Sequence, residues 1–181
     1  MLHYCLAHMA FHLSRRLPRH HRLKFQVIVL ICVTAALAPQ LYVLLSPKSQ
    51  RFCQQPLLPN LACCTASTLV ATGFVVVLSL MDPVPRAYKA AFHGFGVASF
   101  TQGLCTALLT AAAAPCAKTT PELYYLSVVL TVGCVLSTVF FLIMGGFWIA
   151  NRLCPGSVLN QCAQSGVCYE PVSQCSCLWH I

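Results

Sequence analysis

The chain has 181 residues, of which 58% are apolar and only 8% carry a charged side chain. A soluble domain has roughly 25% charged residues, so this chain has too few charges to cover its surface in water. A spanning helix needs about 20 apolar residues, which leaves room for a few spans and excludes a separate soluble catalytic domain. The net charge of +8 does not indicate nucleic acid binding, because five of the eleven basic residues precede the first apolar run and there direct membrane orientation.

Residues 1–24 form a basic arm without an acidic residue. Wound as a helix, the arm has an apolar face, and two histidines and an arginine lie opposite it. The apolar face is Leu2, Leu6, Met9, Leu13 and Leu17, and the opposite residues are His8, His12 and Arg15. Such a helix either lies in the membrane interface or serves as a mitochondrial presequence. Pro18 ends it in both cases.

Four uncharged apolar runs predict an all-α membrane protein with four transmembrane helices and short loops. The predicted spans are residues 25–45, 61–81, 90–114 and 124–150. The first run has the length of a full span and no small-residue cleavage pattern after it, so we interpret it as a retained span rather than a signal peptide. The prolines of the turn at residues 82–86 make the second and third spans antiparallel neighbours.

The third predicted span is the least hydrophobic and is rich in small residues. Four of them recur at a spacing of four, which lets helix backbones approach closely in lipid; they are Ser99, Gly103, Ala107 and Ala111. We therefore expect this span to be buried against other helices. If it fails to insert, the tail lies on the opposite side of the membrane.

Basic residues predict the orientation of the four spans. The arm, the turn between the second and third spans and the tail carry five, two and one Lys or Arg, against two and one in the opposite loops. Because basic residues accumulate on the cytoplasmic side, this asymmetry favours both termini in the cytosol or the mitochondrial matrix.

Cysteines are frequent in the tail, residues 151–181, where their spacing lacks the paired ligands of structural zinc sites. We therefore expect no metal and no cofactor. Cys154 directly follows the last span and is a candidate for S-palmitoylation. In the opposite loops, a disulfide from Cys53 or Cys63 to Cys116 would tie the two loops together.

The spans contain little that could perform chemistry. No Asp, Glu, Lys or Arg lies within them, and His93 and Gln102 are their most polar candidates for a transport path. For both residues we favour a structural role. The chain has no nucleophile, phosphate-binding or metalloprotease motif, and its three acidic residues belong to different connecting segments. The sequence therefore predicts no enzymatic activity.

The order of these segments resembles the small four-span transmembrane proteins of the ciliary transition zone. The likeness covers residues 25–148 and includes the start of the third span at His93-Gly94-Phe95-Gly96, the short loop with Cys116 and the aromatic start of the last span at Tyr124-Tyr125. A tryptophan expected in the last outer loop and an acid expected within the spans are missing here, and the cysteine-rich tail is extra. We therefore transfer no functional residue from this family.

These features together predict a non-enzymatic scaffold, adaptor or membrane organiser that acts through helix packing. Its predicted partners are the lipid bilayer and other membrane proteins, and no nucleic acid. One alternative is a small carrier or channel component, and another is a mitochondrial inner-membrane protein. The plasma membrane, the ciliary membrane, the reticulum and the mitochondrion all stay open as compartments.

Overall fold

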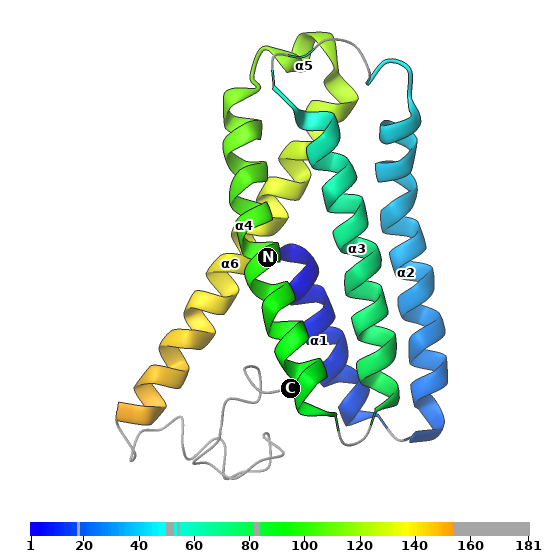
Figure 1. Ribbon diagram of the computed structural model, residues 1–181, viewed down its shortest axis with the longest axis vertical. Helices are drawn as coiled ribbons and strands as arrows, with labels where there is room; N and C mark the ends of the chain where they lie inside the picture. The colour runs from blue at the N-terminus through cyan, green and yellow to red at the C-terminus, as the bar shows by residue number, and fades with distance from the viewer. Residues whose placement is uncertain (18, 50–52, 54, 82–83, 154–181) are drawn as a thin grey trace.

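The computed structural model describes residues 1–17, 19–49, 53, 55–81 and 84–153. Four long helices run alternately up and down the molecule: α2 (Arg19–Leu45), α3 (Leu57–Leu80), α4 (Arg86–Ala112) and α6 (Pro121–Leu153) (Figure 1). Two shorter helices, α1 (Leu2–Arg16) and α5 (Cys116–Thr119), complete the described part of the chain, which contains no strand. For these described residues, the prediction of an all-helical fold is confirmed.

Each long helix contains an apolar stretch that is long enough to cross a bilayer. These stretches are His21–Leu45, Leu57–Leu80, Arg86–Ala112 and Pro121–Gly146. The helices begin earlier than the predicted spans. Helices α2, α4 and α6 take in charged residues at their starts, and α3 takes in the uncharged residues 57–60. Pro56 and Pro85 lie directly before α3 and α4, and Pro121 is the first residue of α6. Proline favours these positions because its fixed φ suits the start of a helix.

The two ends of the bundle differ in their connections. At the disulfide end, defined by residues 46–56 and 113–120, Cys53 bonds to Cys116 with a Cα–Cα distance of 5.6 Å. At the basic end, defined by residues 16–19 and 81–85, α1 turns into α2 and α3 turns into α4. A pairing of Cys53 with Cys116 was one of the two alternatives left by the sequence. Cys63, the other alternative, is an exposed free thiol.

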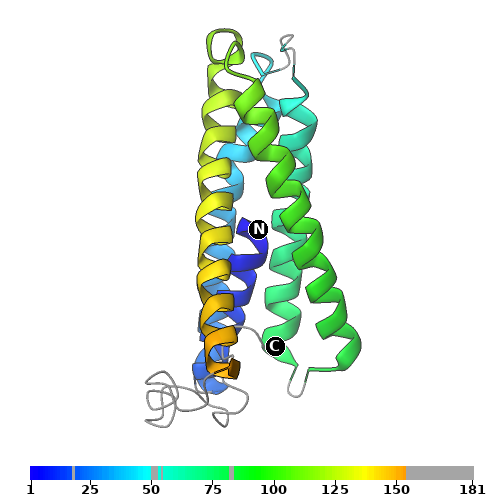
Figure 2. The same ribbon diagram turned by 90° about the vertical axis from the view of Figure 1, so that its left-hand side faces the viewer.

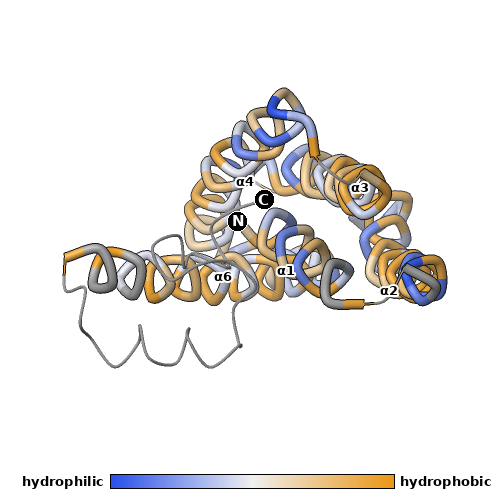
Figure 3. Tube along the Cα trace, turned by 90° about the horizontal axis from the view of Figure 1, so that it is seen from below, coloured by the Kyte–Doolittle hydropathy of each residue, from blue (hydrophilic) through white to orange (hydrophobic). Residues whose placement is uncertain are grey.

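Helix α1 lies inside the basic half of the bundle. Its first residues are near the middle of the long axis, and the helix runs from there toward the basic end (Figures 1 and 2). It packs most extensively against α3 and also contacts α6 and α4. Seen along the bundle from below, α1 lies among the long helices rather than across their ends (Figure 3).

This position differs from a placement in the membrane interface, which was one of the two alternatives predicted for the arm. The helix does end before Pro18, but its two faces have the reverse of the expected environment. His8 is 1% exposed, whereas Leu6 and Leu13 are 57% and 53% exposed. Leu6, Met9 and Leu13 of α1 thus point outward, whereas His3 and His8 point inward.

Helix α6 diverges from the other long helices toward the basic end (Figures 1 and 3). Phe141 is still buried and belongs to the core beside α1, but Leu142 and Ile143 are exposed. Because α6 moves away, α1 has room to occupy the space between the long helices.

Two apolar cores follow from this arrangement. The core of the basic half contains ten buried residues from α1, α3, α4, α6 and the turn before α4. The core of the disulfide half surrounds Leu57, Leu61 and Cys116, the last of which carries the disulfide. Of the two bonded cysteines, Cys116 is thus packed inside an apolar core.

Replacing both Cys53 and Cys116 with serine should lower the stability of the folded chain in detergent. The bond closes a loop with a sequence separation of 63 residues, and loss of a native disulfide costs about 2–4 kcal/mol. Thermal unfolding monitored by circular dichroism measures the effect. Cys63→Ser is the matched control and should keep the wild-type unfolding temperature, and equal unfolding temperatures for the double variant and the wild type would contradict the prediction.

Candidate functional site

The inward face of α1 carries aromatic, histidine and small side chains. Tyr4, Ala7, His8, Phe11 and Ser14 are buried and recur at spacings of three, one, three and three residues. This spacing follows one face of an α-helix. These residues alternate with the exposed Leu6, Met9 and Leu13, so one side of α1 meets the bundle and the other side faces outward.

Tyr4 and His8 place their rings among phenylalanines of α4 and α6. The ring of Tyr4 lies 4.6 Å from that of Phe92 and 5.4 Å from that of Phe141, centre to centre. His8 lies 5.7 Å from Phe141 and 4.6 Å from His12. Aromatic pairs at 4.5–7 Å attract one another beyond the effect of buried area. This ring cluster holds the middle of α1 in place.

Three glycines form a seat for the first turn of α1. A Cβ atom on Gly96 would lie 2.9 Å from Cε2 of Tyr4, and one on Gly133 would lie 3.0 Å from Cδ2 of Leu2. A Cβ on Gly103 would meet the Met1 nitrogen at 3.3 Å and the sulfur of Cys134 at 3.4 Å. Close approach through glycine is a main source of helix association in lipid. We call Gly96, Gly103 and Gly133 the glycine seat.

Polar contacts also join α1 to its neighbours. Nδ1 of His3 lies 3.3 Å from the Thr68 hydroxyl on α3, and Nδ1 of His93 on α4 lies 3.4 Å from the Tyr4 hydroxyl. The Met1 nitrogen donates a hydrogen bond to the Ser99 carbonyl oxygen. The contacts of α1 with α3 and α4 are therefore both steric and polar.

A ladder of polar side chains joins α3 to α4 nearer the disulfide end. Ser67 donates to Oε1 of Gln102 at 2.5 Å, and Nε2 of Gln102 donates to the Cys64 sulfur at 3.4 Å. Further along, Nδ2 of Asn60 donates to the Thr106 hydroxyl at 3.2 Å. Both ends of the Gln102 amide are thus engaged by α3.

Single polar pairs join the remaining helices. Between α2 and α3, Nε2 of Gln26 donates to the Ser79 hydroxyl at 2.7 Å, and Thr65 donates to Oε1 of Gln40 at 3.3 Å. Between α6 and α4, Thr131 donates to the Thr110 hydroxyl at 3.2 Å. Polar groups that are bonded across helices in this way stabilise a membrane bundle by about 0.6 kcal/mol each on average.

The packing face of α4 differs in part from the predicted stripe. Ser99 and Gly103 are buried, Ala107 is half-buried and Ala111 is exposed. A spacing of four residues advances about 40° beyond each full turn of 3.6 residues, so three such steps carry Ala111 off the buried face. The true face alternates spacings of three and four: Phe92, Gly96, Ser99, Gly103, Thr106 and Thr110. Gly96 was missed, although this mixed spacing in the sequence would have found it.

His93 and Gln102 do not share one site. His93 is exposed and lies beside Tyr4, whereas Gln102 is half-buried and bonds to α3. They are nine residues apart, which is about 13.5 Å along the helix. Their hydrogen-bond partners therefore belong to different parts of the bundle.

The remaining sequence predictions concern cysteines and metals. Cys154 lies outside the described residues, as does the rest of the tail. Among the residues that the structure describes, no group of three or more His, Cys, Asp or Glu side chains could hold a metal ion. The candidate site of this protein is therefore the docking place of α1, made by the glycine seat and the ring cluster.

Comparison with protein-family models, curated proteins and solved structures gives no match for this chain.

A leucine at position 96 should displace α1. Its Cβ would overlap the Tyr4 ring, and overpacking of a core costs about 1–3 kcal/mol. Cys5, which is 6% exposed, should then react faster with a membrane-permeant maleimide, as measured by mass spectrometry of its peptide. Gly94→Leu is the matched control, because nothing lies within 4 Å of a Cβ at that position. The idea fails if Gly96→Leu and Gly94→Leu give the same Cys5 reactivity.

Proposed function

We propose that this chain is a non-enzymatic multi-pass membrane protein that serves as a scaffold, adaptor or membrane organiser. The observation that carries the proposal is that polar side chains inside the bundle bond to neighbouring helices. The amide of Gln102, the most polar group of the third span, is engaged at both ends by side chains of α3. A group committed to helix association supports a packing role more than a role in moving a solute.

The outer surface supports the same proposal. The four apolar helices expose large aliphatic side chains along their lengths, including Val97, Leu108 and Leu142 at 69%, 70% and 70%. Such surfaces contact lipid tails or the helices of other membrane proteins. A partner would associate with them through close packing, since lipid supplies no hydrophobic force between helices.

Both termini of the protein face the cytosol in this proposal. The Cys53–Cys116 bond lies at one end of the bundle, and disulfides persist in oxidising compartments. Most basic residues of the connecting segments belong to the other end, as expected for a cytosolic face. These two indications are independent of each other and agree.

The alternatives make different use of the same features. A cleaved presequence is removed from the mature protein, and its removal here would leave the glycine seat without the helix that occupies it. A carrier would use His93, which is exposed beside Tyr4, and this residue is the one feature that favours transport. The resemblance to small four-span proteins makes the ciliary transition zone the first compartment to examine with a tagged chain.

Cysteine labelling in intact cells tests the orientation. An impermeant maleimide should modify the half-buried Cys53 only after its disulfide with Cys116 is reduced. It should modify the tail cysteines, residues 154–177, only after the cells are permeabilised. Modification of the tail in intact, unreduced cells would overturn the proposed orientation.

Three variants separate a scaffold from a carrier. Gly103→Leu should reduce the recovery of co-purifying membrane proteins, because its side chain would press on Met1 and Cys134 and disturb helix packing. His93→Ala and Gln102→Ala should leave that recovery near the wild-type level, since one interhelical hydrogen bond is worth about 0.6–1.7 kcal/mol.

The control for the bulky change is Gly73→Leu on α3, where a Cβ has nothing within 4 Å. Uptake of a panel of small solutes into proteoliposomes is measured for the same proteins. If His93→Ala or Gln102→Ala abolishes an uptake while Gly103→Leu keeps its partners, the chain is a carrier and the scaffold proposal is wrong.

A further inference from the structure

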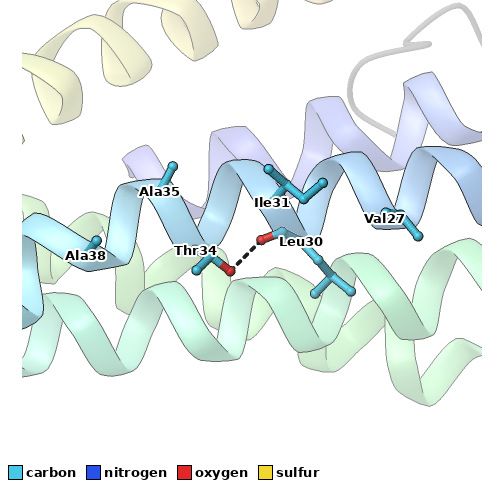
Figure 4. Close-up of a pocket in the computed structure, with 6 residues that line it drawn as sticks. All are labelled: Val27, Leu30, Ile31, Thr34, Ala35 and Ala38. Carbon is cyan, nitrogen blue, oxygen red and sulfur yellow. Dashed lines mark hydrogen bonds between the residues drawn. The ribbon is translucent and has the colours of Figure 1, made fainter.

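Helix α2 contains the least buried of the four candidate spans. Only 11% of its span is buried, against 28% to 39% for the others. On its outer face is a shallow apolar groove of about 510 Å³, lined by Val27, Leu30, Ile31, Thr34, Ala35 and Ala38 (Figure 4). All six residues belong to α2, and the groove is open to its surroundings.

The groove suits a hydrocarbon chain. Its one polar side chain, Thr34, donates a hydrogen bond of 2.8 Å to the carbonyl oxygen of Leu30 and so needs no outside partner (Figure 4). Ala35 and Ala38 are small and leave space beside the larger Ile31. From Val27 to Ala38 the helix rises about 16 Å, which is close to half of the roughly 30 Å hydrocarbon core. The groove therefore matches the depth of one leaflet.

Positive charge lies at the membrane-surface end of the groove. Lys24 is exposed and precedes Val27 by three residues, so it lies on the same face of α2. The exposed His21 is three residues before Lys24 on that face. Residues 15–24 carry five Lys or Arg, and the first acidic residue of the chain is Asp82. An anionic headgroup at this place would meet no carboxylate from the arm or α2.

We propose that α2 carries a binding site for an anionic phospholipid, with the phosphate and headgroup at Lys24 and one acyl chain in the groove. The proposal rests on the membrane insertion assumed in the proposed function, but not on the scaffold role or on which side the termini face. Electrostatic attraction to Lys24 selects an anionic headgroup. The groove holds the acyl chain at this helix, which distinguishes the bound lipid from the other lipids around the protein.

Lipid retention tests the site. The full chain is reconstituted in nanodiscs with equal amounts of phosphatidylserine and phosphatidylcholine, extracted in mild detergent, and examined by native mass spectrometry. Phosphatidylserine should remain bound in preference to phosphatidylcholine. Lys24→Gln should lower the ratio of the two bound lipids about fivefold, the effect of one cation near an anionic membrane surface. Glycerophosphoserine, which has no acyl chains, should not displace the bound lipid.

Two further pairs of variants separate this site from general lipid contact. Lys89→Gln, on α4 at the same end of the bundle, should leave the lipid ratio unchanged. Ala35→Leu should fill the groove and reduce retention of both lipids, whereas Ala98→Leu on the exposed face of α4 should not. Thermal unfolding of each variant identifies a folding defect, and Lys24→Gln tests the site without altering the groove.

Several results would overturn the proposal. Equal retention of the two lipids would mean that the protein keeps only unselected surrounding lipid. Equal effects of Lys24→Gln and Lys89→Gln would mean that surface charge in general, and not this site, attracts the anionic lipid. A protein dimer that is lost in Ala35→Leu would assign the groove to a second copy of the chain. Lipid retention and dimer formation are measured separately from the partner recovery and solute uptake that test the scaffold role. One proposal can therefore fail while the other holds.

Discussion

The close approach of α1 to α4 and α6 is the contact on which the basic half of the structure depends. A Cβ atom at Gly96 would overlap the Tyr4 ring, and a Cβ atom at Gly133 would crowd the Leu2 side chain. Once the first turn of α1 is seated, Tyr4 and His8 can enter the ring cluster around Phe92 and Phe141. The space left by the divergence of α6 is then filled by protein rather than by lipid.

The arrangement of polar side chains follows from the solvent. Lipid tails are as apolar as leucine, so burying leucine inside a membrane bundle gains little, whereas a polar group facing lipid without a partner costs free energy. Serine, threonine and glutamine therefore turn toward neighbouring helices, as Ser67 and Gln102 do. The same rule explains why α1 directs its histidines inward, which is the reverse of an amphipathic helix on a soluble protein.

The two ends of the bundle are held by different means. At the disulfide end a covalent bond joins the loop before α3 to α5, and Cys116 is itself buried in an apolar core. At the basic end no such bond is present among the described residues, and noncovalent packing of α1 closes the bundle. The covalent bond holds the connection between α4 and α6 against the loop before α3, whereas α6 diverges from the other long helices at the opposite end.

The sequence by itself predicted a lipid environment and determined the four apolar helices and the helical arm before Pro18, because these depend on composition and on periods of a few residues. It left two possible partners for Cys116, and only the tertiary structure placed Cys53 rather than Cys63 beside it. It also did not determine which face of α1 points inward, since lipid and protein interior are both apolar. Gly96 was missed for a different reason: the predicted stripe had a fixed spacing of four and rotates away from the partner helix, whereas the buried face alternates spacings of three and four.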